Sequence, residues 1–436
     1  MSGSDWTTDV VIVGSGAAGL ATAIFAKRQA PGLRVVCLDG ARRVGAKILV
    51  SGGSRCNVTN RHVTGRDFWG GQSRVVRNVL RAFSAEQTSR FFADLGVALH
   101  EEEDGKLFPE TNRSRTVLDA LLNEVRCLGV ELHGSERVTH VDHEPDGFTV
   151  TASRGQYRAR VVVLATGGRS LPKSGSDGAG YGLAARLGHG YVETTPALAP
   201  LVLGGDRHVS LAGVAHDVRL IVRVAGGPAT DLDGPLLWTH FGASGPVVLN
   251  ASRHWHRAHL EGGVVEVSVN LCPGATFESL EAWLREQALA RPKALVATVL
   301  ATRLPAAVAT TWTHEAGLAE RTLAHLSRES RRRLIHALLA SPLEVRDSRG
   351  YTVAEATAGG IPLEEIDPMR MASRCCEGLY LVGEMLDVDG RLGGFNFQWA
   401  WSSAWVAGRA IAGALSGDVT VAAATTSATA ESAVHD

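Results

Sequence analysis

The beginning of the chain alternates between fully apolar runs and amphipathic spacing. Residues 9–14 read Asp-Val-Val-Ile-Val-Gly, a short β-branched run ending in glycine, which is typical of a buried parallel strand. Helical spacing follows over about residues 17–29, and Pro31-Gly32 interrupts it. Residues 34–39 form a second buried apolar run. Strand, helix and strand in this order predict a βαβ unit with a right-handed crossover.

The pattern changes twice further along the chain. Short alternating strands separated by Gly and Pro begin near residue 196, helical spacing dominates from about residue 277, and buried-strand character returns near residue 345. A long helix is predicted from about Phe395 to Leu415. We therefore predict an α/β protein with one discontinuous α/β domain, into which a β-domain and a helical domain are inserted. The predicted domains are residues 1–190 plus 345–415, residues 191–275 and residues 276–344, followed by an Ala/Thr/Ser-rich tail, residues 416–436, which we expect to be disordered.

Composition and charge narrow the class of protein. The chain has 436 residues and a formal net charge of −1, so we expect no nucleic acid and no anionic membrane surface as a partner. The first residues are polar and no long apolar stretch exists, so we expect neither a secretory signal nor a membrane span. The six cysteines are scattered except for Cys375-Cys376 and form no C-x-x-C pair, which favours a cytoplasmic location.

The first candidate motif is a glycine-rich turn between the first strand and the first helix. It reads Gly14-Ser-Gly16-Ala-Ala-Gly19, and Asp39 ends the next strand. Gly14 allows the tight turn, Gly16 lets the backbone approach a pyrophosphate, and Gly19 lets the helix pack closely on the strand. Asp39 is placed to bind a ribose. The context predicts dinucleotide binding but does not separate NAD from FAD.

Later segments favour FAD. Residues 164–168 form a strand that ends in two glycines, and Gly383-Glu384 follows another apolar run. Gly393-Gly394 precedes the long C-terminal helix, whose N-terminus could stabilise the anionic reduced flavin. Read separately, these segments are also compatible with strand-ending turns and a capped core helix. We interpret the stripe Trp399, Trp401 and Trp405 mostly as packing.

Four longer stretches carry a resemblance to a known family. They are residues 46–60 (Ala-Lys-Ile-Leu-Val-Ser-Gly-Gly-Ser-Arg-Cys-Asn-Val-Thr-Asn), 238–246, 356–360 and 383–401. Together they resemble the BaiN/YhiN-like flavoproteins, a family that includes aminoacetone-oxidase-type enzymes. Two positions depart from the family pattern: Ala46 stands where arginine is usual, and Ser54 where glycine is usual.

The resemblance implies noncovalent FAD in an α/β protein of three parts: a Rossmann-type FAD-binding domain (two-dinucleotide-binding fold), an inserted β-barrel-like domain and a small helical domain. It implies that the ADP half of FAD lies on the first glycine turn and that the other segments close around the pyrophosphate, ribitol and ring. The implied cofactor-binding residues are Gly14, Ser15, Gly16, Ala17, Gly19, Asp39, Lys47, Ser51, Gly52, Gly53, Arg55, Cys56, Asn57, Ala165, Thr166, Gly167, Gly383, Glu384, Asp387, Gly394, Phe395 and Asn396.

Two residues are candidates for catalysis. Arg55 could bind an anionic substrate or stabilise the reduced flavin, and its alternative is a structural ion pair. His240 could transfer a proton or bind substrate, and its alternative is a hydrogen-bonded loop histidine. Cys56 could be a redox thiol, but a small buried residue is the favoured interpretation because no resolving cysteine is near in the sequence. We expect no metal site.

These observations predict a FAD-dependent oxidoreductase. The preferred hypothesis is an oxidase or dehydrogenase that takes a hydride from a small amine, an amino ketone or a related metabolite, with molecular oxygen or another electron acceptor reoxidising the flavin. The alternative enzyme is an NAD(P)H-dependent reductase of a conjugated C=C bond. In that case NAD(P)H visits transiently, because no second dinucleotide motif is present. A third hypothesis is a FAD-bound binding or regulatory protein without turnover. The substrate, the nicotinamide preference and the oligomeric state stay open.

Overall fold

The computed structural model describes residues 8–431, with side chains up to residue 416. The chain forms two compact units. Unit 1 contains the described residues up to Thr194 and from Ala356 onward, and unit 2 is Thr195–Glu355. The predicted return to the first domain at residue 345 differs from this division. The reason is that β18 (Val345–Ser348) pairs with β12 (Leu201–Leu203) and therefore belongs to unit 2.

Unit 1 is built on a mixed sheet whose centre is parallel. Its central strands run in the order β22, β10, β1, β2 and β7, and each neighbouring pair among them is parallel. The predicted apolar runs at residues 9–14 and 34–39 form β1 and β2, whose residues are almost all buried, as is typical of parallel strands covered on both faces. The carboxyl ends of parallel strands lie at one edge of the sheet, where open α/β sheets bind cofactors. The bounds are β1 (Thr8–Val13), β2 (Val35–Leu38), β7 (Glu131–His133), β10 (Gly155–Leu164) and β22 (Leu379–Leu381).

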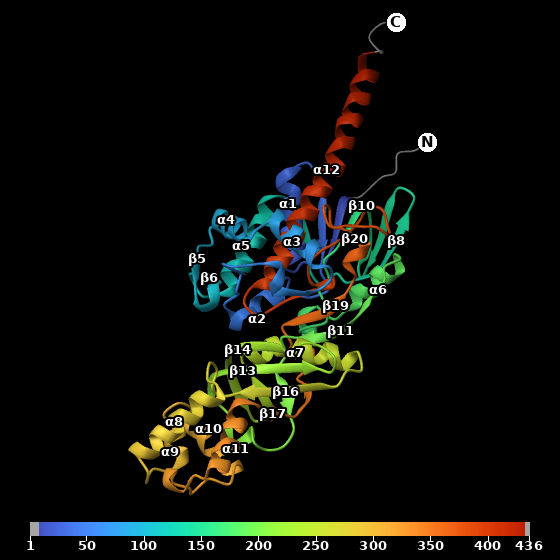
Figure 1. Cartoon of the computed structure of the whole chain (residues 1–436). Helices are drawn as coiled ribbons and strands as arrows, with labels where there is room; N and C mark the ends of the chain where they lie inside the picture. Colours follow the sequence, from blue (N-terminus) through green and yellow to red (C-terminus); the bar gives the residue numbers. More distant parts are fainter. Residues whose placement is uncertain (1–7, 432–436) are drawn as a thin grey trace. The chain divides into compact units, whose positions relative to one another are not determined.

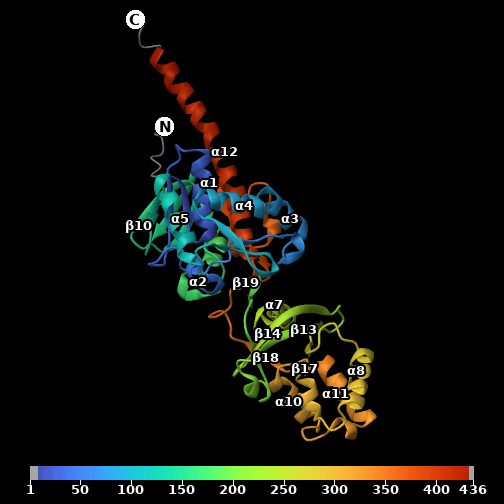
Figure 2. The ribbon, with the colours of Figure 1, turned by 90° about the vertical axis from the view of Figure 1, so that its left-hand side faces the viewer.

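The helices α1 (Ala17–Gln29) and α12 (Phe395–Glu431) pack side by side against this sheet (Figures 1 and 2). Their close approach depends on Gly408, where a Cβ atom would lie 2.8 Å from the Cβ of Phe25. The helix α12 continues to Glu431, whereas the sequence predicts its end near Leu415 and a disordered tail over residues 416–436. The alanine-rich stretch favours continued helix formation over residues 416–431. Residues 432–436 of the predicted tail lie outside the described residues.

The remaining elements of unit 1 complete the sheet, form smaller sheets and cover them. The strands β9 and β8 extend the sheet from β10 with antiparallel pairing, and β20 and β21 extend it from β22. The strand β11 pairs with β19 in a separate two-stranded sheet. The bounds are α2 (Ala46–Ser54), α3 (Ser73–Ala82), α4 (Ala85–Asp94), α5 (Ser114–Cys127), α6 (Ala179–Arg186), β3 (Thr59–Asn60), β4 (Phe68–Gly70), β5 (Leu99–Glu101), β6 (Lys106–Pro109), β8 (Val138–Glu144), β9 (Gly147–Ala152), β11 (Val192–Ala197), β19 (Ala356–Gly360), β20 (Ile366–Asp367), β21 (Ala372–Ser373) and β23 (Val388–Gly390).

Unit 2 is a seven-stranded antiparallel sheet with helices packed on it. The sheet order begins with β17 and ends with β18, which only Glu344 separates in the chain, so one continuous piece of backbone joins its two edges. This topology agrees with the predicted barrel-like character. The further bounds are β13 (Ala215–Val224), β14 (Thr230–Thr239), β15 (Gly242–Ser244), β16 (Val265–Asn270), β17 (Ser341–Leu343), α7 (Pro246–Leu260), α8 (Phe277–Ala290), α9 (Val296–Leu300), α10 (Ala306–Glu315) and α11 (Arg328–Leu339).

The strands and helices of unit 2 share one apolar core. Val218 and Trp238 of the sheet belong to the same buried cluster as Val299, Trp312 and Leu334 of the helices. The indole rings of Trp238 and Trp312 lie 5.9 Å apart between centroids. The predicted separation into a β-domain and a helical domain therefore becomes one unit in the structure, because neither layer buries its apolar face alone.

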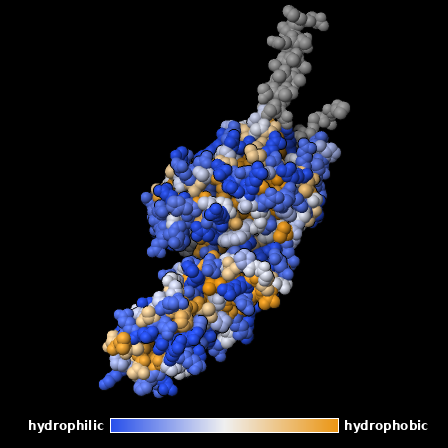
Figure 3. All heavy atoms as spheres, in the orientation of Figure 1, coloured by the Kyte–Doolittle hydropathy of each residue, from blue (hydrophilic) through white to orange (hydrophobic). Residues whose placement is uncertain are grey.

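Polar residues cover most of the visible face of each unit (Figure 3). Within residues 8–431, no helix combines the length and the apolar character that crossing a bilayer requires.

Candidate functional site

The glycine turn after β1 separates the roles of its three glycines. Gly14 has a φ of 99°, and a Cβ atom there would lie 2.5 Å from the carbonyl oxygen of Ala165. A Cβ atom on Gly19 would lie 1.9 Å from the carbonyl oxygen of Gly14. Around Gly16, by contrast, no heavy atom lies within 4 Å of an added Cβ. Close backbone packing therefore requires glycine at positions 14 and 19. Gly16 instead leaves open space at the N-terminus of α1, and a helix N-terminus stabilises a pyrophosphate.

Asp39 holds the same turn from the end of β2. Its Oδ2 accepts a hydrogen bond from the Ser15 N–H at 2.8 Å and its Oδ1 accepts one from the Ala41 N–H at 2.7 Å. Burial raises the pKa of the Asp39 carboxyl above its ordinary value, and these two hydrogen bonds offset part of that rise. The carboxylate thus lies beside the glycine turn, as a ribose-binding acid in this fold requires.

The ends of β1 and β10 meet beside the turn. The Ala165 N–H donates to the Val13 carbonyl at 2.8 Å, which fixes the start of the predicted segment Ala165-Thr166-Gly167. The hydroxyls of Ser15, Thr166 and Ser176 are buried and have no hydrogen-bond partner among the described residues. A buried hydroxyl without a partner is costly, so each favours a polar ligand at this edge. Together with the open space at Gly16, they fit the phosphates and sugar hydroxyls of FAD.

A buried polar network joins four segments at the same edge of the sheet. Lys47 of α2 donates to the Glu384 carboxylate and to the Ser170 hydroxyl. The Glu384 Oε1 also accepts from the Ser170 hydroxyl at 2.8 Å and from the Thr357 N–H at 3.0 Å. The Thr357 hydroxyl accepts from the N–H groups of Arg169 and Ser170 at 2.9 and 3.1 Å. Sequence reasoning gave Lys47 and Glu384 as flavin contacts but gave no role to Ser170 or Thr357.

The last residues of α2 have non-helical backbone angles, and together with the residues that follow they form the loop of residues 51–57. Gly52, Gly53 and Ser54 have φ values of 54°, 66° and 68°, and Cys56 has a φ of 62°. Such values favour glycine. Ser54, where the family usually has glycine, is therefore in a strained conformation. The Asn57 Oδ1 in this loop is buried without a partner among the described residues.

Cys56 is inaccessible in this loop. Its side chain is 0% exposed, and burial raises the pKa of its thiol to about 12. A thiol of this kind is protonated at neutral pH and is a poor nucleophile. The structure therefore supports the interpretation of Cys56 as a small buried residue. Cys375 and Cys376 are both free thiols.

Arg55 lies in the same loop, where it forms an ion pair with Glu102 and stacks on the ring of Phe108. Its Nη1 donates to the Glu102 Oε1 at 2.6 Å, and its guanidinium lies 4.1 Å from the centroid of the Phe108 ring. The Nε2 of His100 lies 3.3 Å from the same Glu102 oxygen. The hydrogen bond from Arg55 holds the pKa of the Glu102 carboxyl below its ordinary value. The structural ion pair considered for Arg55 is thus present, and its role toward substrate stays a prediction.

The start of α12 lies directly against Thr59 of β3. Gly394 has a φ of 91°, and a Cβ there would lie 2.5 Å from the Thr59 backbone. Asn396 exchanges two hydrogen bonds of 2.9 Å with the backbone of Gly390, and the Phe395 ring is a core side chain packed edge-on to Phe68. These contacts fix the backbone at the helix N-terminus.

Two other predicted residues of this region are held through their backbones. The Asp387 N–H donates to the Ile361 carbonyl at 2.8 Å, and the Asp387 carbonyl accepts from the Gly71 N–H. Trp399 is buried and its indole donates to the Gly383 carbonyl at 3.1 Å. The tryptophan stripe is therefore packing that also fixes a motif segment.

His240 belongs to unit 2, between β14 and β15. Its ring lies edge-on to the Phe241 ring, with 5.1 Å between centroids. The guanidinium of Arg349 lies 4.7 Å from the centroid of the same Phe241 ring. The other predicted site residues belong to unit 1. A catalytic role for His240 stays a prediction.

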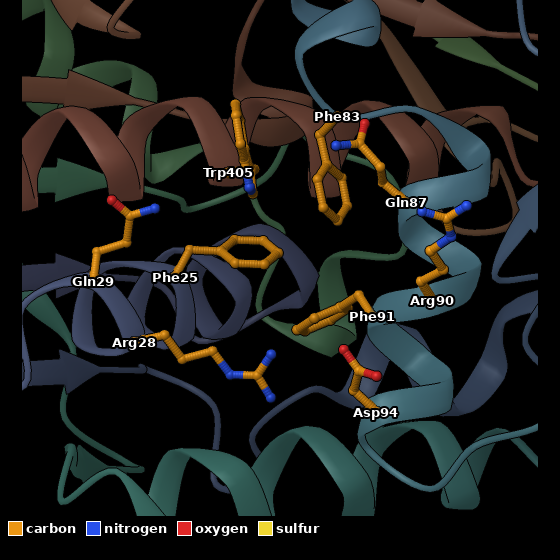
Figure 4. Close-up of a pocket in the computed structure, with 9 residues that line it drawn as sticks. All are labelled: Phe25, Arg28, Gln29, Phe83, Gln87, Arg90, Phe91, Asp94 and Trp405. Atoms are coloured by element: carbon orange, nitrogen blue, oxygen red, sulfur yellow. The ribbon is translucent and has the colours of Figure 1, made fainter.

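A hollow of about 280 Å³ in unit 1 lies apart from these residues. Figure 4 shows the rings of Phe25, Phe83, Phe91 and Trp405 around it, from α1, α4, α12 and the turn between α3 and α4. None of the predicted cofactor residues lines it. The hollow is therefore separate from the candidate flavin site.

Comparison with known proteins decides the family. Residues 8–410 match the family described as HI0933-like protein Rossmann domain. This chain belongs to the HI0933-like family. It is 31% identical over 402 residues to the 3-dehydro-bile acid delta(4,6)-reductase of Clostridium scindens, covering 92% of this chain and 98% of that protein. It is 33% identical over 404 residues to the ribosomal RNA dihydrouridine synthase of Escherichia coli, covering 91% of this chain and 96% of that protein.

Among solved structures, this HI0933-like chain is similar to the Sdh1 complex of Mycobacterium smegmatis, with a TM-score of 0.50 and 17% identity over 96% of this chain and 71% of that one. That likeness concerns the fold alone. The comparisons confirm the resemblance to BaiN/YhiN-like flavoproteins and the Rossmann-type FAD-binding fold. The protein is a FAD-dependent oxidoreductase.

Proposed function

We propose that this HI0933-like protein reduces a carbon–carbon double bond conjugated with a carbonyl group. The observation that carries the proposal is the pair of relatives above, each matched over more than nine-tenths of this chain. Their named substrates, a bile acid and ribosomal RNA, have little in common. The named reactions agree, however: a delta(4,6)-reductase of a 3-keto compound and a dihydrouridine synthase both add two hydrogens to a C=C bond conjugated with a C=O.

The chemistry suits the residues of unit 1. When bound, FAD supplies the hydride, and the reaction overall consumes NAD(P)H and one proton and adds two hydrogens to the substrate. The protein must bind the carbonyl oxygen, whose negative charge grows as the hydride arrives. Arg55 is the candidate for this task, since the Glu102 ion pair and the Phe108 ring hold its guanidinium in a fixed orientation.

This proposal differs from the preferred sequence hypothesis. Oxidation of an amine or amino ketone stays a prediction, as do oxygen as an acceptor and a cytoplasmic location. The absence of nucleic acid, predicted from the charge balance, is an open prediction as well, because one relative is named for acting on ribosomal RNA.

The test is an anaerobic titration of the FAD-loaded protein with NADH and with NADPH, followed by the flavin absorbance. We expect one nucleotide to bleach the flavin and a conjugated enone, offered next, to restore its colour. Bleaching by an amine with oxygen consumption, and none by either nucleotide, would overturn the proposal in favour of an oxidase.

Two candidate substrates, each with a C=C bond conjugated with a C=O, distinguish a small-molecule substrate from an RNA substrate. One is a 3-keto steroid acid with conjugated double bonds, and the other is ribosomal RNA from cells that lack the protein. Mass spectrometry of both products detects the gain of two hydrogens.

The variant His240→Ala, assayed beside wild type, tests the predicted contribution of that residue. A fall in turnover with unchanged flavin reduction would support a role for His240 in delivering the proton to substrate.

A further inference from the structure

The Lys47–Glu384 pair lies where α/β sheets bind cofactors. Glu384 follows β22, and Ser170 follows β10, at the carboxyl ends of two adjacent parallel strands. The side chains of Lys47 and Glu384 are 26% and 17% exposed. Because both side chains are partly buried, water and salt screen each charge less than at an exposed site, so each acts on whatever binds beside it.

The protein itself occupies much of the hydrogen-bonding capacity of Glu384. Oε2 accepts from Lys47, and Oε1 accepts from Ser170 and from the backbone of Thr357. Gly167, in the predicted cofactor segment, lies beside this carboxylate: a Cβ there would be 3.8 Å from Oε2. The arrangement suits a carboxylate that orients and neutralises Lys47 next to the cofactor.

Thr357 and Ser170 hold this arrangement together. Both are 0% exposed. The Thr357 hydroxyl accepts two backbone N–H groups of the segment that carries Ser170, and the Ser170 hydroxyl contacts both charged groups. Without the Thr357 hydroxyl, the N–H groups of Arg169 and Ser170 lose this acceptor, and Ser170 loses its anchor.

We propose that Lys47 and Glu384 set the redox potential of the bound flavin as opposed charges, and that Ser170 and Thr357 are the positioning residues of this pair. The inference rests on FAD binding in unit 1 and does not depend on which substrate is reduced. The reduced flavin carries more negative charge than the oxidised flavin. A lone Lys47 cation therefore stabilises the reduced form, and a lone Glu384 carboxylate destabilises it.

The experiment measures the reduction potential of bound FAD by co-reduction with a reference dye. Glu384→Gln should raise the potential and Lys47→Met should lower it, each by about 30 mV or more. For a two-electron couple this corresponds to about a tenfold change in the binding of reduced relative to oxidised FAD. Lys47→Arg keeps the charge and should leave the potential near wild type. The exposed pair Arg90–Glu86 offers a matched control, since Glu86→Gln should change nothing.

The opposite signs distinguish this proposal from structural damage, which weakens FAD binding in both variants without shifting the potential in opposite directions. Where a variant binds FAD weakly, the ratio of dissociation constants of oxidised and reduced FAD gives the same quantity through the thermodynamic cycle. Shifts of the same sign, or none, would overturn the proposal.

The positioning role is tested at Thr357 with two substitutions. Thr357→Val keeps the shape but removes the acceptor, and we expect at least tenfold weaker FAD binding together with a shifted potential. Thr357→Ser keeps the hydroxyl and should restore both. A valine variant with wild-type FAD affinity and potential would remove Thr357 from the proposal. No substrate is used, so these outcomes are independent of the reductase assay.

Discussion

Gly19 lies so close to Gly14 that a methyl group on Gly19 would approach the Gly14 carbonyl oxygen to 1.9 Å. The helix α1 can start directly against the turn only because residue 19 has no side chain. Gly19→Ala should therefore destabilise the FAD-free protein, by about 2 kcal/mol or more, because backbone has to move to relieve the overlap. Urea unfolding of the apoprotein measures the effect.

Gly16 behaves differently in the same turn. Its φ of −79° suits any residue, and an added Cβ meets no atom within 4 Å. Gly16→Val should leave the stability of the apoprotein within about 0.5 kcal/mol of wild type. The valine methyls would occupy the space of the pyrophosphate, so the purified variant should be colourless. A yellow, fully loaded Gly16→Val protein would show that the cofactor does not lie on this turn.

This contrast shows what sequence reasoning could supply. The turn, the following helix and the acidic residue lie within one βαβ unit, so local spacing predicted Gly14, Gly19 and Asp39 correctly as parts of one structure. The apolar runs at residues 9–14 and 34–39 predicted β1 and β2 for the same reason. Each depends on short-range rules of burial and backbone conformation.

Short-range rules could not predict side-chain contacts between residues far apart in the sequence. Lys47 and Glu384 lie 337 positions apart, and Ser170 and Thr357 lie 187 apart, so no spacing in the sequence connects them. Glu102, which binds Arg55, lies in a short segment without a motif. The end of unit 2 was misplaced because β18 pairs with β12, which local apolar character does not specify.

Arg55→Ala should spare the flavin and impair the reaction. The side chain of Arg55 is 41% exposed and contacts Glu102 and Phe108, so its loss should change stability by less than about 1 kcal/mol. If Arg55 binds the substrate carbonyl, the catalytic rate constant should fall by about a hundredfold, as for loss of one oxyanion donor. Stopped-flow reoxidation of the reduced flavin by substrate measures it. Wild-type kinetics with a proven substrate would exclude this role.

The Arg55–Glu102 pair also predicts a dependence on pH. The folded state lowers the pKa of Glu102, so the pair contributes stability above the ordinary carboxyl pKa of about 4.3 and loses that contribution as the pH falls through the lowered value. Neutral pH should therefore leave the orientation of Arg55 intact. At neutral pH, Glu102→Gln should weaken that orientation and raise the KM for substrate, and this difference from wild type should disappear below the lowered pKa of Glu102. An unchanged KM would show that Glu102 does not position Arg55.

Gln398 is the buried polar centre of the region where α12 meets the rest of unit 1. Its side chain is 0% exposed, its Oε1 accepts from the hydroxyls of Thr59 and Thr88, and its Nε2 donates to the Phe83 carbonyl at 2.9 Å. Gln398→Leu has a similar volume but leaves the hydroxyls of Thr59 and Thr88 without their acceptor, whereas the Phe83 carbonyl keeps the Ser402 hydroxyl as a donor. Since a buried unsatisfied group costs about 1–3 kcal/mol, we expect a loss of about 2–4 kcal/mol in the unfolding free energy of unit 1.

The matching control is Gln156→Leu, because Gln156 is exposed on β10 and its amide donates to the Thr151 hydroxyl at 3.3 Å. That change should stay within about 0.5 kcal/mol of wild type. Thr59 lies against Gly394 at the start of α12, so the Gln398 variant should also bind FAD more weakly than the control. Urea unfolding of both apoproteins, with FAD titration of each, measures the two effects. If Gln398→Leu were as stable as Gln156→Leu, the Gln398 hydrogen bonds would not hold α12 in place. The apolar contacts of the tryptophans of α12 would then account for its position.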